Sequence, residues 1–245
     1  MGDNLNEKEI VARFALTLIG DAEVIGLGSG TTMMAFLDAV RCWEGRKGRI
    51  FIPSSGEIAR KAREIGLKIA DLEEFEYADI TIDGADEIDR DLNLLKGGGG
   101  FLTREKILAA SSRRYVIIAD HTKLVEKLCS RKPLPVEVIR FGSSSTLRRI
   151  MERTGWVCRI REAGSSRYIT DNGNYIIDLF PDRPLEKPHE VLRMIKEIPG
   201  VVEVGLFLSM ADEAYVAFGD KVKGIRRGGG PQPGGNAVLI HQEKG

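Results

Sequence analysis

The sequence predicts an α/β protein, and three observations support this prediction. Short apolar segments alternate with amphipathic helical segments over the first 130 residues, which is typical of a parallel sheet covered by helices on both faces. Pro133 and Pro135 then mark a change in composition. The segments that follow have the order β-α-β-β-α-β, the ferredoxin-like pattern. We therefore expect a Rossmann-like parallel sheet domain with an inserted, smaller ferredoxin-like α+β domain.

The same pattern predicts the domain boundaries. The Rossmann-like domain should comprise residues 1–130 together with 208–227, because Glu213 to Phe218 reads as a strand that returns to the first sheet. The ferredoxin-like domain should comprise residues 131–207. Residues 228–245 are rich in Gly and Pro and are expected to form a flexible tail.

The bulk composition argues against several classes of protein. Lys and Arg together number 36, as do Asp and Glu, so the net charge is zero, which disfavours a general nucleic-acid binder. No apolar run is long enough to span a membrane, and no signal peptide is recognisable. The three cysteines form no CxxC pair, as expected of reduced thiols. We expect a cytoplasmic protein with neither nucleic acid nor membrane as a partner.

The first elements along the chain predict an anion site. Asn6 can cap the first helix, with Glu9 as its capping-box partner, and Lys8 lies in the first turn. A strand over 23–27 is followed by a glycine-rich turn and a helix start, where free N–H groups and the helix dipole converge. The candidate ligands in this turn are Gly28, Ser29, Gly30, Thr31 and Thr32. A GxGxxG nucleotide loop would need glycine where Thr31 stands.

The next strand, over 49–52, leads to Ser54 and Ser55. A dinucleotide or S-adenosylmethionine site would usually have an acid at this point for the ribose hydroxyls. Two serines instead favour a small polar or anionic ligand. A helix is then expected over 57–65.

The segment from Asp83 to Lys106 contains the strongest functional signal. Its charged candidates are Asp83, Asp86, Lys96 and Glu105. Asp83 ends a buried strand over 78–82, and ligands of open α/β sheets bind at the carboxyl ends of strands. Gly97 to Gly100 let a bare backbone approach a ligand closely. Thr103 can cap the next helix, which places Glu105 in its first turn, and Lys123 follows another buried strand at 115–119.

With these residues in place, the chain resembles the type A family of ribose-5-phosphate isomerases over nearly its whole length to about Arg227. Ile25 to Thr32 is similar to the phosphate loop of the family, and Thr81 to Ile88 and Leu95 to Lys106 are similar to its two active-site segments. Three motifs of the second domain also match: Pro133 to Val138, Thr170 to Asn174 and Ile198 to Val202. The tail after Arg227 departs from the pattern.

The resemblance implies interconversion of D-ribose 5-phosphate and D-ribulose 5-phosphate through an enediolate, in the non-oxidative pentose phosphate pathway. It implies that Glu105 is the shuttling base, that Asp83 helps to open the sugar ring, and that Lys96 with Asp86 and the glycine-loop N–H groups stabilises the oxyanion. The implied substrate-binding residues are Lys8, Gly28, Ser29, Gly30, Thr31, Thr32, Ser54, Ser55, Gly97, Gly98, Gly99 and Lys123. No metal or cofactor is implied, and a homodimer or homotetramer is expected.

Three alternatives compete with this interpretation. A nucleotide-dependent Rossmann enzyme would leave Lys96, the glycine run and Glu105 without a role. A phosphosugar-binding regulator would usually carry a DNA-binding helix-turn-helix, for which there is no room before Glu23. A Mg²⁺ site at Asp83, Asp86 and Glu87 is chemically reasonable for carboxylates, but Asp-x-x-Asp is weak evidence when a lysine is expected in the same pocket.

Overall fold

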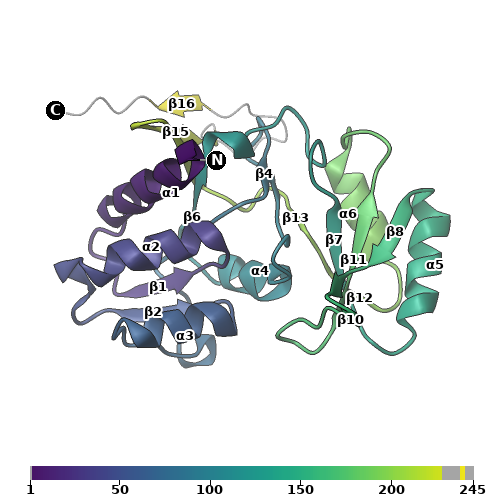
Figure 1. Ribbon diagram of the computed structural model, residues 1–245, viewed down its shortest axis with the longest axis horizontal. Helices are drawn as coiled ribbons and strands as arrows, with labels where there is room; N and C mark the ends of the chain where they lie inside the picture. The colour runs from purple at the N-terminus through teal and green to yellow at the C-terminus, as the bar shows by residue number, and fades with distance from the viewer. Residues whose placement is uncertain (1, 228–237, 241–245) are drawn as a thin grey trace.

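The computed structural model describes residues 2–227 and 238–240, and a seven-stranded sheet forms its larger body (Figure 1). In spatial order its strands are β16 (Val238–Ile240), β15 (Lys221–Arg226), β14 (Glu213–Phe218), β6 (Tyr115–Asp120), β3 (Ile80–Asp83), β1 (Val24–Leu27) and β2 (Ile50–Pro53). The strands from β14 to β2 are parallel, whereas β15 and β16 add antiparallel pairs at one edge. The predicted Rossmann-like sheet is therefore confirmed, including the return of 213–218 beside β6.

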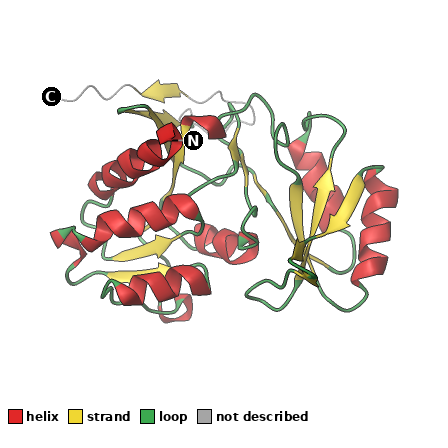
Figure 2. Ribbon diagram, viewed as in Figure 1, coloured by secondary structure: helices red, strands yellow, loops and turns green. Residues whose placement is uncertain are grey.

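Helices cover both faces of this sheet (Figure 2), as the strand composition requires. They are α1 (Gly2–Ala15), α2 (Thr31–Arg41), α3 (Gly56–Glu64) and α4 (Leu102–Ala110). Along β6, Val116 and Ile118 pack into the core shared with α1, α2 and α3. Tyr115, Ile117 and Ala119 belong to the core that includes residues of α4. Because side chains alternate along a strand, β6 is apolar on both faces, and α4 lies on the face opposite α1 and α2.

A four-stranded antiparallel sheet forms the smaller body (Figure 1). Its strands, in spatial order, are β12 (Val201–Val204), β7 (Leu134–Val138), β11 (Tyr175–Phe180) and β8 (Val157–Ile160), and its helices are α5 (Ser143–Thr154) and α6 (Pro188–Lys196). The order β12-β7-β11-β8 is that of a ferredoxin-like sheet. The hairpin β9 (Glu162–Ala163) and β10 (Ser166–Arg167) extends from β8. The limits of the inserted domain, 131 and 207, stay a prediction.

A third, three-stranded sheet connects the two bodies. It pairs β4 (Glu87–Ile88), β5 (Leu94–Leu95) and β13 (Leu206–Phe207) in antiparallel register. Directly after β5, the Lys96 N–H donates to the Gly205 carbonyl at 2.8 Å. A Cβ at Gly205 would lie 2.2 Å from the Lys96 carbonyl oxygen, so only glycine permits this approach. The backbone of the site segment is thus held by the chain that leaves the smaller body.

Two predicted helix caps are wrong. The first helix begins at Gly2, so Asn6 lies inside α1 and does not cap it. Helix α4 begins at Leu102 with Phe101 at its N-cap position, and no side chain caps it. Thr103 lies within the first turn of α4, not before it where a capping side chain would accept from the first N–H groups; its hydroxyl instead donates to the buried carboxylate of Glu137 in β7. By contrast, the Ser55 hydroxyl does cap α3, which begins one residue before its predicted start.

The predicted flexible tail, residues 228–245, falls largely outside the described residues. Residues 228–237 and 241–245 are not described. Val238–Ile240 form β16, in register with Gly224 to Arg226 of β15, so this short apolar run adds an edge strand to the larger sheet.

Glu137 offers a test of how firmly the smaller body holds α4. Its carboxylate is 1% exposed and accepts hydrogen bonds from Thr103, Thr170, Asn172 and Asn174. Glu137→Ala leaves these donors without an acceptor, so we expect the free energy of unfolding to fall by about 2–4 kcal/mol. Urea denaturation measures the change, with the exposed Glu162→Ala as control. A loss below about 1 kcal/mol would show that water replaces the carboxylate.

Candidate active site

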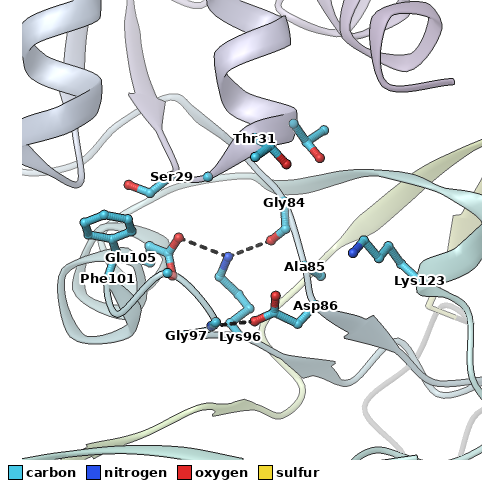
Figure 3. A pocket seen from close by; sticks show the side chains of 14 residues that line it. Ser29, Thr31, Gly84, Ala85, Asp86, Lys96, Gly97, Phe101, Glu105 and Lys123 are labelled. Atoms are coloured by element: carbon cyan, nitrogen blue, oxygen red, sulfur yellow. Dashed lines mark hydrogen bonds and ion pairs between the residues drawn. The ribbon is translucent and has the colours of Figure 1, made fainter. Parts of the chain in front are cut away.

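A pocket lies at the carboxyl ends of β1, β3 and β6, where the strand-end rule places a ligand (Figure 3). It brings together these predicted residues: Ser29, Gly30, Thr31, Thr32, Asp86, Lys96, Gly97, Gly98, Gly99, Glu105 and Lys123. Gly84, Ala85 and Phe101 also line it and were missed, because a small residue between two acids and an aromatic residue before a helix carry no chemical signal of their own. The predicted residues Lys8, Gly28, Ser54, Ser55 and Asp83 do not line the pocket.

Lys96 is the centre of the charged cluster. Its side chain is 3% exposed, and its Nζ lies 2.6 Å from the Gly84 carbonyl oxygen and 3.3 Å from Glu105 Oε1 (Figure 3). Asp83 Oδ2 lies 2.9 Å from the same Nζ. Burial lowers the pKa of Lys96, but the charges of Asp83 and Glu105 outweigh burial, so the pKa lies above its ordinary value. Lys96 therefore stays a charged ammonium group.

For Glu105, burial has a larger effect on the pKa than the neighbouring opposite charge has. It is 4% exposed, in the first turn of α4. Burial raises the pKa of Glu105 from 4.5 to about 8; the Lys96 charge opposes this shift, and the charges of Asp83 and Asp86 add to it. Three carboxylates, those of Asp83, Asp86 and Glu105, share the single ammonium group of Lys96, so its charge does not offset the effect of burial on the pKa of Glu105. A carboxyl group that can both hold and release a proton near neutral pH is suited to general acid–base chemistry.

Asp83 is fully buried and saturated with donors. Oδ1 accepts from the N–H groups of Gly84 at 2.7 Å and Ser29 at 3.3 Å. Oδ2 accepts from the Tyr115 hydroxyl at 2.9 Å and pairs with Lys96. Sequence reasoning missed Tyr115, since a tyrosine opening a buried strand reads as a core residue. With both oxygens occupied by protein donors, Asp83 is not available as the metal ligand that the Mg²⁺ alternative requires.

Gly28 explains why Asp83 can lie where it does. A Cβ at Gly28 would lie 1.8 Å from Asp83 Oδ1. The glycine therefore makes room for the carboxylate between β1 and β3, and it does not contact the pocket itself.

The turn after β1 is organised by serines. Ser29 Oγ lies 2.8 Å from both Ser54 Oγ and Ser55 Oγ. Ser54 and Ser55 are buried, so they fix the Ser29 hydroxyl through these hydrogen bonds and do not line the pocket themselves. Gly30 has φ 97° and precedes the first turn of α2, which leaves the N–H groups of that turn available to an anion.

Two lysines flank this turn. Lys8 Nζ donates to Thr31 Oγ1 at 3.0 Å, which brings α1 to the entrance of the pocket although Lys8 does not line it. Lys123 lines the pocket and lies on the side away from Glu105 (Figure 3). The site thus has a cationic end near α2 and a carboxylate end near α4.

The glycine loop closes the carboxylate end. Gly97 and Gly100 have φ 102° and 84°, in the left-handed region that favours glycine. The Gly98 N–H donates to Asp86 Oδ2 at 2.7 Å, and a Cβ at Gly98 would lie 2.7 Å from Asp86 Oδ1. The loop can therefore pass close to Asp86 only without side chains.

In the described part of the chain, no group of three or more His, Cys, Asp or Glu side chains is placed to hold a metal ion. None of the helices in that part is long and apolar enough to span a membrane.

The raised pKa of Glu105 predicts a pH-dependent stability. The folded state holds the Glu105 proton up to about pH 8, whereas the unfolded chain releases it near 4.5. The folded state therefore binds more protons in this window, and the stability linked to Glu105, fully present below pH 4.5, is lost as pH rises through 8. Urea denaturation from pH 5 to 8.5 should show the wild type losing stability relative to Glu105→Gln, and ¹³C NMR should follow the carboxyl titration directly. An apparent pKa near 4.5 would contradict this.

Comparison with known proteins gives one consistent result. The family model described as ribose 5-phosphate isomerase A (phosphoriboisomerase A) matches residues 50–221. A ribose-5-phosphate isomerase A from Korarchaeum cryptofilum is 51% identical over 223 residues, which cover 91% of this chain and 98% of that protein. One from Gloeobacter violaceus is 45% identical over 213 residues, which cover 86% and 91%.

Solved structures agree with these sequences. Ribose 5-phosphate isomerase A from Methanocaldococcus jannaschii superposes with a TM-score of 0.84 at 37% identity, covering 91% of this chain and 99% of the other. A D-ribose-5-phosphate isomerase in complex with phospho-erythronic acid gives a TM-score of 0.86 at 33% identity, with the same coverage of 91% and 99%. This chain belongs to the ribose-5-phosphate isomerase A family.

Proposed function

We propose that this chain interconverts D-ribose 5-phosphate and D-ribulose 5-phosphate through an enediolate, the aldose–ketose isomerisation of the non-oxidative pentose phosphate pathway. The observation that carries this proposal is the pairing of buried Glu105 with buried Lys96, 3.3 Å apart, in a pocket at the strand ends. A carboxylate beside a fixed cation is what proton transfer next to a carbonyl group needs.

The proposed reaction moves one proton between neighbouring carbons. Glu105 takes the proton from C2 of the open-chain aldehyde; the electrons of that bond form the C1=C2 double bond, and the C1=O1 π electrons pass to O1 to give the enediolate. The proton of the O2 hydroxyl then moves to O1, Glu105 returns its proton to C1, and O2 becomes the ketone oxygen. One carboxylate serves both steps, and its raised pKa allows it to hold the proton in between.

The charge that develops on O1 and O2 needs a counterpart that is already in place. Lys96 supplies a permanent positive charge, and Asp86 orients the glycine loop through the Gly98 N–H. These groups are fixed by the fold before the reaction, so little reorganisation is needed as the charge forms.

Asp83 is proposed to take part in ring opening, and its burial limits the ways in which it can do so. The side chain is 0% exposed and lies 2.9 Å from Lys96 Nζ. Because Asp83 does not line the pocket, we propose that it acts on ring opening through Lys96, whose ammonium group it holds in place and keeps charged.

The phosphate group is proposed to bind at the cationic end of the pocket. The first turn of α2, from Thr31, offers N–H groups and the Thr31 and Thr32 hydroxyls. Lys8 beside Thr31 and Lys123 across the pocket add positive charge. Ser54 and Ser55 contribute indirectly by holding Ser29.

The rival functions fit the geometry less well. A ribose of a bound dinucleotide would need an exposed acceptor after β2, but Ser54 and Ser55 are 3% and 2% exposed and already paired with Ser29. A helix-turn-helix before β1 would need two packed helices, but described residues 2–23 contain one α-helix, α1, followed by a single 3₁₀ turn. A homodimer or homotetramer in the cytoplasm stays a prediction.

Phosphate binding predicts effects on KM. The phosphate group does not react, so its contacts should be similar in the ground and transition states. Thr32→Val and Lys8→Ala should therefore raise KM for ribose 5-phosphate more than they lower kcat, and wild-type enzyme should convert unphosphorylated ribose far more slowly. Steady-state kinetics measure both effects, with the exposed Lys47→Ala as control. Unchanged KM in both variants would place the phosphate elsewhere.

Glu105→Gln should abolish most of the activity. The substitution keeps size and removes the basic oxygen, so kcat should fall at least about 10²–10⁴-fold while substrate binding is retained. In deuterated water the wild type should place deuterium on the product carbon, at least in part, and Glu105→Gln should not. Glu57→Gln, on the exposed face of α3, is the matched control. An active Glu105→Gln enzyme that still exchanged this hydrogen would make Asp86 or Asp83 the base.

A further inference from the structure

The smaller body contacts the glycine loop through two side chains that the proposed reaction leaves without a role. Arg161, which follows β8, donates from one Nη1 atom to the carbonyl oxygens of Gly97 and Gly98, both at 2.9 Å. Tyr168, which follows β10, donates its hydroxyl proton to the Gly99 carbonyl oxygen at 2.8 Å. Three consecutive carbonyl groups of the loop are therefore held from the same side.

Arg161 is itself fixed before it reaches the loop. Its Nε and Nη2 atoms bind the two carboxylate oxygens of Asp178 in β11, at 2.9 and 2.5 Å. A planar guanidinium group paired in this two-pronged way has little freedom to move. The Arg161 and Asp178 side chains are each 15% exposed, so solvent competes little for these contacts.

The direction of the carbonyls determines the direction of the amides. In a trans peptide unit the C=O and N–H bonds point in opposite directions, and the structure has no cis peptide bond in its described residues. The Gly99 N–H, which shares a peptide unit with the Gly98 carbonyl, must therefore point away from Arg161. The Gly98 N–H reaches Asp86, and the Gly100 N–H closes a turn on the Gly97 carbonyl.

The Gly99 N–H is the one of these three N–H groups that makes no hydrogen bond within the described residues. Gly99 lines the pocket that contains Lys96 and Glu105. The carbonyl of the same peptide unit, that of Gly98, faces the positive charge of Arg161. A cation bonded to the carbonyl polarises the peptide and strengthens its N–H as a donor.

We propose that Arg161 and Tyr168 are positioning residues of the isomerase site, which hold the glycine loop so that the Gly99 N–H donates to the enediolate. This proposal rests on the proposed function. Four consecutive glycines have more backbone freedom than any other sequence of this length, so the loop needs an external restraint to keep one conformation. The smaller body supplies that restraint, and Arg161 and Tyr168 apply it to the glycine loop beside Lys96 and Glu105.

The test separates the reacting end from the phosphate end. Arg161→Gln and Tyr168→Phe remove the donors to the loop, and Arg161→Lys keeps the charge without the two-pronged pairing. Arg159→Gln is the matched control, because Arg159 is an exposed arginine of the neighbouring strand β8 that stacks on Phe180 and makes no bond to the loop. Each variant is assayed for kcat and KM with ribose 5-phosphate, for affinity towards phospho-erythronic acid and inorganic phosphate, and for its melting temperature.

The expected result is a loss of kcat with little change in KM. Displacing a reacting geometry by a small distance can lower the rate by about 10²-fold, so Arg161→Gln should lose about 10- to 100-fold in kcat, Arg161→Lys less, and Tyr168→Phe least. Affinity for phospho-erythronic acid should fall along with kcat, whereas affinity for inorganic phosphate should not. Arg159→Gln should behave as wild type.

Each contrary outcome has a definite meaning. If wild type and Arg159→Gln do not convert ribose 5-phosphate, the proposed function fails and this inference fails with it. If they are active and Arg161→Gln keeps kcat within about twofold, only this inference is overturned. If Arg161→Gln does not fold, Tyr168→Phe, which removes a single oxygen atom, decides: a wild-type kcat in that variant overturns the role in positioning.

Discussion

The buried cluster of Lys96 with Asp83 and Glu105 is the constraint to which the rest of the site is fitted. Three charged groups at 5% exposure or less would be costly to bury singly, and they are tolerated because the ammonium group lies between the carboxylates. The fold completes the compensation with the Gly84 carbonyl for Lys96 and with backbone N–H groups and the Tyr115 hydroxyl for Asp83. Burial raises the pKa of Glu105, and the negative charges of Asp83 and Asp86 add to this shift.

This arrangement requires close approaches that only glycine permits. Gly28 admits the Asp83 carboxylate between β1 and β3, and Gly98 admits Asp86 beneath the loop. The same absence of side chains that allows these contacts also removes stiffness from the loop. The cluster thus depends on restraint from outside the larger sheet.

The smaller body provides this restraint on two sides of Glu105. On one side, Arg161 and Tyr168 hold the glycine-loop carbonyls. On the other, two residues of α4 close to Glu105 in sequence bind the smaller body: Thr103 donates to Glu137, and Lys106 donates to Glu203. Consecutive residues of a helix point in different directions, so Glu105 can face the pocket while its neighbours anchor α4 to the smaller sheet. The second body therefore positions the Glu105 carboxylate although none of its residues lines the pocket.

The sequence by itself determined the alternating fold and the position of the pocket at the strand ends, because these follow from local patterns: strand periodicity, a glycine run, and acids placed directly after buried strands. It also picked out Glu105, Lys96 and Asp86, which line this pocket; the roles expected of them come from the resemblance to the family. Only the tertiary structure decided that Asp83 lies behind the pocket, that Ser54 and Ser55 support Ser29, and that Tyr115, Arg161 and Tyr168 belong to the site. Arg161 is 64 residues away from Gly97 in the sequence, and Tyr115 is 32 residues away from Asp83. Contacts at such separations are set by how sheets and helices pack in three dimensions, and no pattern of neighbouring residues encodes them.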